Sequence, residues 1–274
     1  MEAFKNIHIN KAEIKNVHNE LMRRLDKLLK FAYSQNIPMK DLDRNCIIEY
    51  FNYWKIPEKP KDIPALMKIF FTCLFTYAPV RKYLSSIIGK IPTSNDLPYC
   101  LYKIYDEKGF LTDQNWTPTK LHHIAAKIQQ KEGYDLRSKK FKPRMISVFL
   151  DGTKEMEKRL KRGIEEFYQE LERLNKGSGE EMWEYAKKFS MHIYNVGTAL
   201  ICDFLKDIGC DRFVKVDHHF KKEFPSLLGL SDCKQLSPKE HFILSQEISK
   251  IIKISPFHLD HLLYQWGRYK KYDQ

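Results

Sequence analysis

Apolar residues recur along most of the chain at intervals of three and four positions, the spacing that places them on one face of an α-helix. In the first charged segment they are Leu21, Leu25, Leu28, Leu29 and Ala32, and the same periodicity recurs to the C-terminus. The alternation of apolar and polar residues that is typical of strands is scarce. The pattern therefore predicts an all-α protein.

Several predicted helices have clear start signals. Thr117-Pro118, Ser237-Pro238 and Ser255-Pro256 each place a capping hydroxyl before a proline. At the first helical position the missing proline N–H costs nothing, because that group has no partner within the helix. Ser237 and Glu240 also have the spacing of a capping box. These signals predict helices that begin at residues 118, 238 and 256.

Stretches rich in proline and glycine, at 56–64, 89–98 and 175–180, predict loops between helices. The apolar segment 69–80 predicts a buried helix. Segment 153–175 has mixed charge and predicts one solvated helix with a single packed face. Its apolar stripe consists of Met156, Leu160, Ile164, Phe167, Leu171 and Leu174.

Charge suggests a class of partner but does not establish it. The 274-residue chain has 47 Lys and Arg against 35 Asp and Glu, a net charge of +12. A basic surplus favours anionic partners such as nucleic acid, and basic residues surround Phe141 in segment 136–144. No apolar run approaches the roughly 18 residues of a membrane span, so we expect no membrane association. The expected location is the cytoplasm with its DNA, or the nucleus in a eukaryote.

Metal-binding patterns are weak. The six cysteines, at positions 46, 73, 100, 202, 210 and 233, form no CxxC pair, so we expect reduced thiols rather than a zinc or iron–sulfur site. His218 and His219 are adjacent, and adjacent helical residues point about 100° apart. His258 and His261 have i,i+3 spacing but no evident third ligand. We therefore expect no metal site.

The segment Ile193–Gly209, IYNVGTALICDFLKDIG, predicts a turn between two helices. One helix is expected to end near Ile193, and the next to begin at Thr198 after a turn through Asn195 and Gly197, residues that tolerate positive φ. The second helix would direct free N–H groups outward, which suits a DNA phosphate. An ordinary corner between two helices explains the same residues.

Three short motifs together resemble the helix-hairpin-helix DNA glycosylase superfamily (HhH-GPD), which includes endonuclease III and the 8-oxoguanine glycosylases. Residues 193–197 align with the hairpin sequence Leu-Pro-Gly-Val-Gly. Residues 216–219, Val-Asp-His-His, match the V-D-x-H context of the essential aspartate, twenty positions after Gly197. Residues 258–271 resemble the helix that closes the endonuclease III fold. The resemblance covers roughly residues 180–270, and residues 1–150 show no comparable motif.

The resemblance implies a two-lobed helical fold. One lobe would consist of residues 1–60 plus 210–274, and the other of residues 61–209, ending in the hairpin at about 182–208. Asp217 would be the catalytic residue in the cleft between the lobes, and it would also be the N-cap of a helix that begins at His218. The implied DNA-binding residues are Asn195, Val196, Gly197, Thr198 and His219. Weaker candidates for the base pocket are Trp183, Trp266 and Tyr269.

The implied function is removal of a damaged or modified base from double-stranded DNA by a monomeric enzyme. Bifunctional members carry a lysine just after the hairpin glycine, whereas the matching residue here is Ala199. This predicts a monofunctional enzyme that uses water. Lys206 and Lys215 are nearby in sequence but not in the matched place. No iron–sulfur cluster is implied, and the only ion left open is a monovalent cation at the hairpin.

Three alternatives remain from the sequence. The first is a bifunctional glycosylase and AP lyase whose nucleophilic lysine lies elsewhere. The second is a DNA-binding protein that keeps the hairpin without catalysis. The third is a helical scaffold whose match to the three motifs is accidental.

Overall fold

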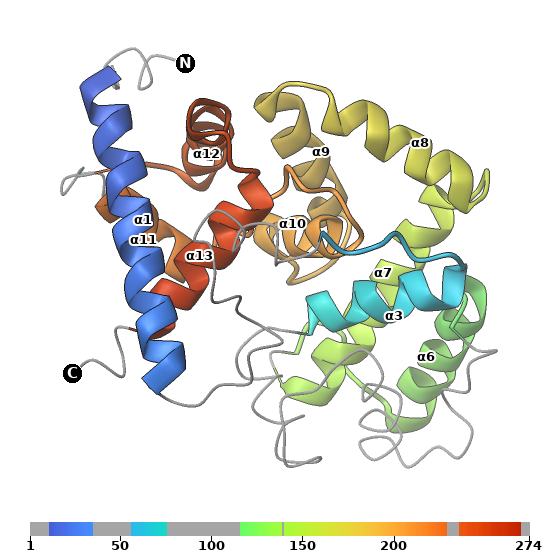
Figure 1. The fold of residues 1–274 in the computed structure, drawn as a ribbon. Helices are drawn as coiled ribbons and strands as arrows, with labels where there is room; N and C mark the ends of the chain where they lie inside the picture. The colour runs from blue at the N-terminus through green and yellow to red at the C-terminus, as the bar shows by residue number, and fades with distance from the viewer. Residues whose placement is uncertain (1–10, 35–55, 76–115, 139, 229–235, 270–274) are drawn as a thin grey trace. The chain divides into compact units, whose positions relative to one another are not determined.

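The computed structural model describes residues 11–34, 56–75, 116–138, 140–228 and 236–269. Within these ranges it contains ten α-helices and no strand (Figure 1), which confirms the predicted all-α class. The chain divides into two compact units, Met1–Pro57 with Asp211–Gln274 and Glu58–Cys210. None of the helices in the described ranges is long and apolar enough to cross a membrane. Assembly of the units into the two lobes of a glycosylase stays a prediction.

The first unit contains four helices, α1 (Lys11–Ser34), α11 (His218–Leu227), α12 (Pro238–Ile252) and α13 (Pro256–Tyr269). Each of them packs against the other three, and α1 and α13 lie close together in Figure 1. Burial of large apolar side chains is the main force that holds such helices together. The fully buried side chains include Leu21, Leu25, Phe224, Phe242, Leu259, Leu262 and Leu263.

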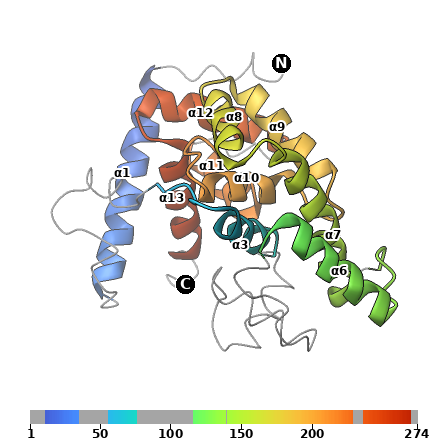
Figure 2. The same ribbon diagram turned by 90° about the vertical axis from the view of Figure 1, so that its right-hand side faces the viewer.

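The second unit contains α3 (Ile63–Leu74), α6 (Pro118–Glu132), α7 (Phe141–Arg159), α8 (Ile164–Asn175), α9 (Gly179–Met191) and α10 (Thr198–Asp207). Helices α6 and α7 lie side by side (Figures 1 and 2). Phe70 of α3 joins the last two helices, because its ring stacks on Phe189 at 5.8 Å and meets Phe204 edge-on at 4.9 Å. These aromatic contacts fix the mutual position of α9 and α10.

Proline start signals are confirmed at α6, α12 and α13, each of which begins at its proline. The predicted capping box of Ser237 and Glu240 is present, and Ser255 Oγ accepts a hydrogen bond from His258 N at 3.3 Å. Thr117 is the exception, because its side chain makes no capping hydrogen bond. A second capping box, Ser178 with Glu181, begins α9 and was not predicted.

The single helix predicted at 153–175 is wrong. Helix α7 ends at Arg159 and α8 begins at Ile164. Gly163 lies between them at φ 102° and ψ 167°, a backbone conformation that is essentially restricted to glycine. The apolar periodicity continues across the break because Leu160 and Ile164 are both buried. The apolar periodicity of the sequence therefore did not indicate that α7 ends at Arg159.

Some predictions fall outside the described residues. These are the loop at 89–98, residues 76–80 of the predicted buried helix, the side chains of Leu29 and Ala32, and Cys46, Cys100 and Cys233. The described part of the apolar segment belongs to α3, where Phe70, Phe71 and Leu74 are buried as predicted. Cys73, Cys202 and Cys210 are buried in the protein interior.

Candidate functional site

The predicted turn between two helices is present. Helix α9 ends at Met191, and α10 begins at Thr198 as predicted. Asn195 adopts the left-handed conformation, with φ at 61°, which asparagine tolerates better than other residues with a Cβ atom. Gly197 is the N-cap of α10 in an extended conformation, with φ at −89° and ψ at 161°. In this turn, positive φ is therefore required at Asn195 and not at Gly197.

Two side chains of α7 hold this turn. Tyr194 N donates a hydrogen bond to Asp151 Oδ2 at 3.1 Å, and Arg144 Nη2 donates to the carbonyl of Asn195 at 3.1 Å. Sequence reasoning missed Asp151. Arg144 was predicted only as part of a basic segment that contacts phosphate. In the structure its guanidinium also anchors the backbone of the turn.

The N-terminus of α10 has no side-chain cap. Within the described ranges, no acceptor is found for the backbone N–H groups of Gly197, Thr198 and Ala199. A Cβ atom added at Gly197 would meet nothing within 4 Å, so the space beside this residue is open. Free N–H groups and the positive end of a helix dipole favour an anion at this position.

Exposed apolar side chains flank the turn. Met191 is 73% exposed and Tyr194 is 42% exposed, although large apolar side chains are usually covered. Val196, a predicted DNA-binding residue, is buried, so its side chain anchors the turn. Exposure of Met191 and Tyr194 was not predicted, because each fits the apolar pattern of a packed helix end.

Asp217 is the N-cap of α11, as predicted. Its Oδ1 accepts a hydrogen bond from Phe220 N at 3.1 Å, and its own N–H donates to the carbonyl of Lys215 at 2.7 Å. The side chain is half-buried. No hydrogen bond to Oδ2 is present in the described part of the chain, so one carboxylate oxygen is fixed and the other is available.

The segment before Asp217 is attached to α13. Val214 and Val216 are buried, and Lys215 N donates a hydrogen bond to Asp260 Oδ2 at 3.3 Å. At the other end of the loop, Phe257 N donates to the carbonyl of Asp211 at 2.9 Å. These contacts hold the chain on the N-terminal side of Asp217.

The two histidines after Asp217 have different surroundings. His218 is exposed, whereas the His219 ring meets Tyr264 edge-on at 5.7 Å. A Cβ atom added at Gly267 would lie 3.3 Å from His219 Nδ1, so a glycine in α13 permits this close approach. His219 therefore packs between α11 and α13. Among the described residues, no group of three or more His, Cys, Asp and Glu could hold a metal ion.

The predicted base-pocket residues are mostly interior. Trp183 of α9 and Trp266 of α13 are buried, and the Arg24 guanidinium lies 5.2 Å from the centre of the Trp266 ring. The side chain of Tyr269 lies outside the described residues. A base-pocket role for these three residues stays a prediction.

Lys206, considered above as a relocated nucleophile, is buried in α10. Its Nζ lies 3.1 Å from Asp203 Oδ1, and both side chains are about nine-tenths covered. A lysine that is buried and held by a carboxylate in this way is poorly placed to attack a sugar carbon.

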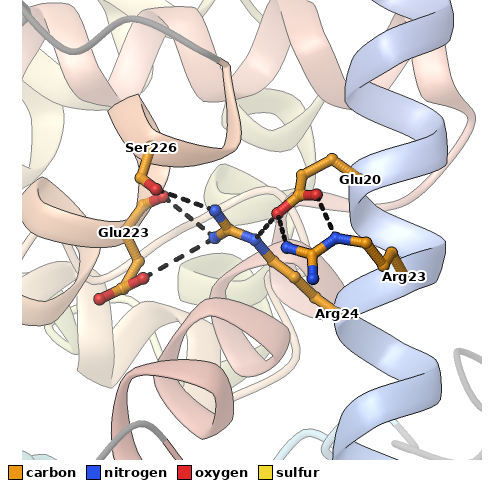
Figure 3. Close-up of polar contacts among 5 residues, drawn as sticks. All are labelled: Glu20, Arg23, Arg24, Glu223 and Ser226. Atoms are coloured by element: carbon orange, nitrogen blue, oxygen red, sulfur yellow. Dashed lines mark hydrogen bonds and ion pairs between the residues drawn. The ribbon is translucent and has the colours of Figure 1, made fainter.

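A polar cluster fixes α11, the helix that Asp217 caps, against α1 (Figure 3). Arg24 is 2% exposed and Glu223 is 1% exposed. The Arg24 guanidinium donates to Glu20 Oε1 at 2.7 Å and to Ser226 Oγ at 3.0 Å, and it lies 3.8 Å from Glu223 Oε2. Hydrogen bonds from Arg23, together with those from Arg24, lower the pKa of Glu20 to about 2. The Glu20 carboxylate is therefore ionised at neutral pH.

Comparisons of the chain with models of known protein families, with curated proteins and with solved structures found no match.

Arg24 and Arg23 provide a matched pair for testing this cluster. We expect Arg24→Met to lower the free energy of unfolding by about 3 kcal/mol, because it removes a cation that lies 3.8 Å from the buried Glu223 carboxylate. Arg23 is also a partner of Glu20, but its side chain is half exposed. We therefore expect Arg23→Met to lower the free energy of unfolding by about 1 kcal/mol or less. Urea unfolding measures both values. Equal losses would show that Arg24 does not hold α11.

Proposed function

We propose that the protein is a base-excision DNA glycosylase that hydrolyses the N-glycosidic bond of a damaged or modified base in double-stranded DNA. The observation that carries the proposal is the turn between α9 and α10, with Asn195 in the left-handed conformation and the first N–H groups of α10 open to an anion. The net charge of +12 and the motif around Asp217 support the same proposal.

The hairpin turn binds a phosphate of the DNA backbone in this proposal. The N–H groups of Gly197, Thr198 and Ala199 donate to the phosphate oxygens, and the dipole of α10 adds a favourable charge interaction. Such contacts position the protein without reading the base sequence. Tyr194 and Met191, exposed beside the turn, contact the sugar and backbone next to that phosphate.

Asp217 acts on the sugar. Breaking the bond between C1′ and the base develops positive charge on the deoxyribose, which a fixed carboxylate stabilises. The fixed Oδ1 holds the side chain in one orientation, and Oδ2 accepts a proton from the attacking water. The water oxygen then bonds to C1′ while the base leaves with the bonding electrons. The target nucleotide must first be flipped out of the duplex, because the reacting atoms are otherwise stacked inside it.

The proposed enzyme is monofunctional. Formation of a Schiff base with the sugar needs an amine at the reacting carbon, and Ala199 supplies none. Lys206 is paired with Asp203. Base release should therefore leave an intact abasic strand, without the strand scission that an AP lyase produces.

Asp217→Asn provides the sharpest test of the chemistry. Asparagine caps a helix about as well as aspartate, so the variant should fold and bind DNA normally. We expect base release to fall about 100-fold or more, because the amide can neither accept the proton nor stabilise positive charge. Single-turnover assays on duplexes with oxidised, alkylated and deaminated bases measure release, and thermal unfolding checks the fold.

Three results would contradict parts of this proposal. Full base release by Asp217→Asn would overturn the role of the carboxylate. A covalent adduct trapped with borohydride would show a lysine nucleophile and therefore a bifunctional enzyme. Binding to every duplex without release of any base by the unmodified protein would favour the non-catalytic hairpin protein.

Gly197→Asp tests the phosphate contact separately from stability. Aspartate is a preferred N-cap residue, so α10 should be as stable as before or slightly more so. The added carboxylate would repel a phosphate at the same N–H groups, and we expect DNA affinity to fall at least about tenfold. Gly197→Ser is the neutral control, since serine also caps the helix. Fluorescence anisotropy with a labelled duplex measures both variants, and equal affinities would place the phosphate elsewhere.

A further inference from the structure

A groove of about 810 Å³ lies among α7, α8 and α9 in the second unit. Its lining is mainly charged and comes from the last turns of α7, the loop after it, and the facing sides of α8 and α9. Six basic side chains line it, Lys158, Arg159, Lys161, Arg162, Arg173 and Lys188. Three glutamates share the groove, so the lining has an excess of positive charge.

Two of the glutamates are paired. Glu155 accepts hydrogen bonds from Arg159 at 2.7 and 2.8 Å, and Glu166 Oε2 lies 3.7 Å from Arg162 Nη1. Glu170 is the remaining acidic side chain in the groove. These two ion pairs neutralise two of the three carboxylates and two of the six cations. The lining therefore keeps an excess of positive charge.

Four cations of the groove lie outside these two pairs, Arg173 and three lysines. Lys158, Lys161 and Lys188 are all exposed, and no ion pair involving them is found in the residues that the structure describes. They lie at the end of α7, in the loop after it, and on α9. Their ammonium groups therefore face solvent from two sides of the groove.

Contacts with α9 and with Glu155 hold the Arg159 side chain in the groove. The Arg159 guanidinium lies 3.8 Å from the centre of the Phe189 ring and 4.7 Å from that of Tyr185, while Glu155 binds its other edge. Such cation–π contacts hold the arginine in one orientation. Burial raises the pKa of Tyr185, so its phenol adds no negative charge at neutral pH.

The groove continues from the hairpin turn along two helices. Asp151, which holds the turn, is followed on the same face of α7 by Glu155 and Arg159, which line the groove at intervals of four residues. On the other side, His192 lines the groove and directly precedes the turn. The groove therefore begins about one helical turn, roughly 5.4 Å, from the side chain that anchors the hairpin.

We propose that this groove binds the phosphodiester backbone of a DNA strand that continues past the phosphate at the hairpin turn. The proposal rests on the proposed function, because it takes DNA as the partner of the hairpin. A strand of DNA presents a negative charge about every 3.4 Å along its axis, and so carries further phosphates into the groove. The separated lysines suit such a row of charges better than they suit one compact anion, which needs donors that converge on a point.

The double variant Lys161→Gln with Lys188→Gln tests the groove. Both side chains are exposed, so the fold should be unaffected, and circular dichroism checks this. We expect weaker binding to a short undamaged duplex, and a salt dependence of log K whose slope is smaller by about 1.8, because each lost phosphate contact removes about 0.9. The matched control is Lys127→Gln with Lys176→Gln, which removes two exposed lysines of the same unit outside the groove. We expect its slope to be unchanged.

Four other results of these binding measurements would overturn the groove proposal, alone or together with the proposed function. An unchanged slope in the groove variant, with binding still weakened by Gly197→Asp, overturns the groove and leaves the proposed function standing. Unchanged binding in both variants overturns both proposals. An equal loss in the lysine control shows an effect of net charge rather than of the groove. Binding to polyglutamate is measured in parallel. If the groove variant loses binding to polyglutamate but not to DNA, the occupant is an acidic peptide, and the proposal is overturned.

Discussion

The attachment of the hairpin turn to α7 is the constraint on which the other features of the second unit depend. Asp151 and Arg144 bind the backbone of Tyr194 and Asn195. These bonds support the left-handed conformation of Asn195 in the turn that precedes the N-terminus of α10. The same face of α7 also lines the basic groove. Helix α7 therefore contributes to both surfaces that are proposed to bind DNA phosphates, the hairpin turn and the groove.

The first unit uses buried charge in a similar way. Arg24 joins α1 to α11 through Glu20, Ser226 and Glu223, and α11 begins at the carboxylate that we assign to catalysis. A cap that uses only one oxygen of Asp217 combines a fixed orientation with an available base. In both units, therefore, a side chain with a structural role orients the group that is proposed to act on DNA.

Sequence periodicity and local signals predicted the features that depend on neighbouring residues. The all-α class, the helix starts at three prolines, the start of α10 and the cap at Asp217 belong to this group. The break at Gly163 was missed because the apolar periodicity continues through it. The anchors of the hairpin were missed for a different reason: they lie 43 and 51 residues from the turn in sequence, and only folding brings them together. The basic groove likewise needs three helices to be packed before its lysines share a surface.

Backbone amide shifts on addition of DNA test the central claim most directly, because they locate the bound phosphate without altering the protein. In a titration of ¹⁵N-labelled protein with an undamaged duplex, we predict that the largest changes occur at Gly197, Thr198 and Ala199, whose N–H groups have no acceptor within the described residues. Smaller changes should follow along the groove, at residues such as Lys161 and Lys188. Saturation of DNA binding with the three amides unchanged would contradict the account, because the hairpin turn would then not be the phosphate site.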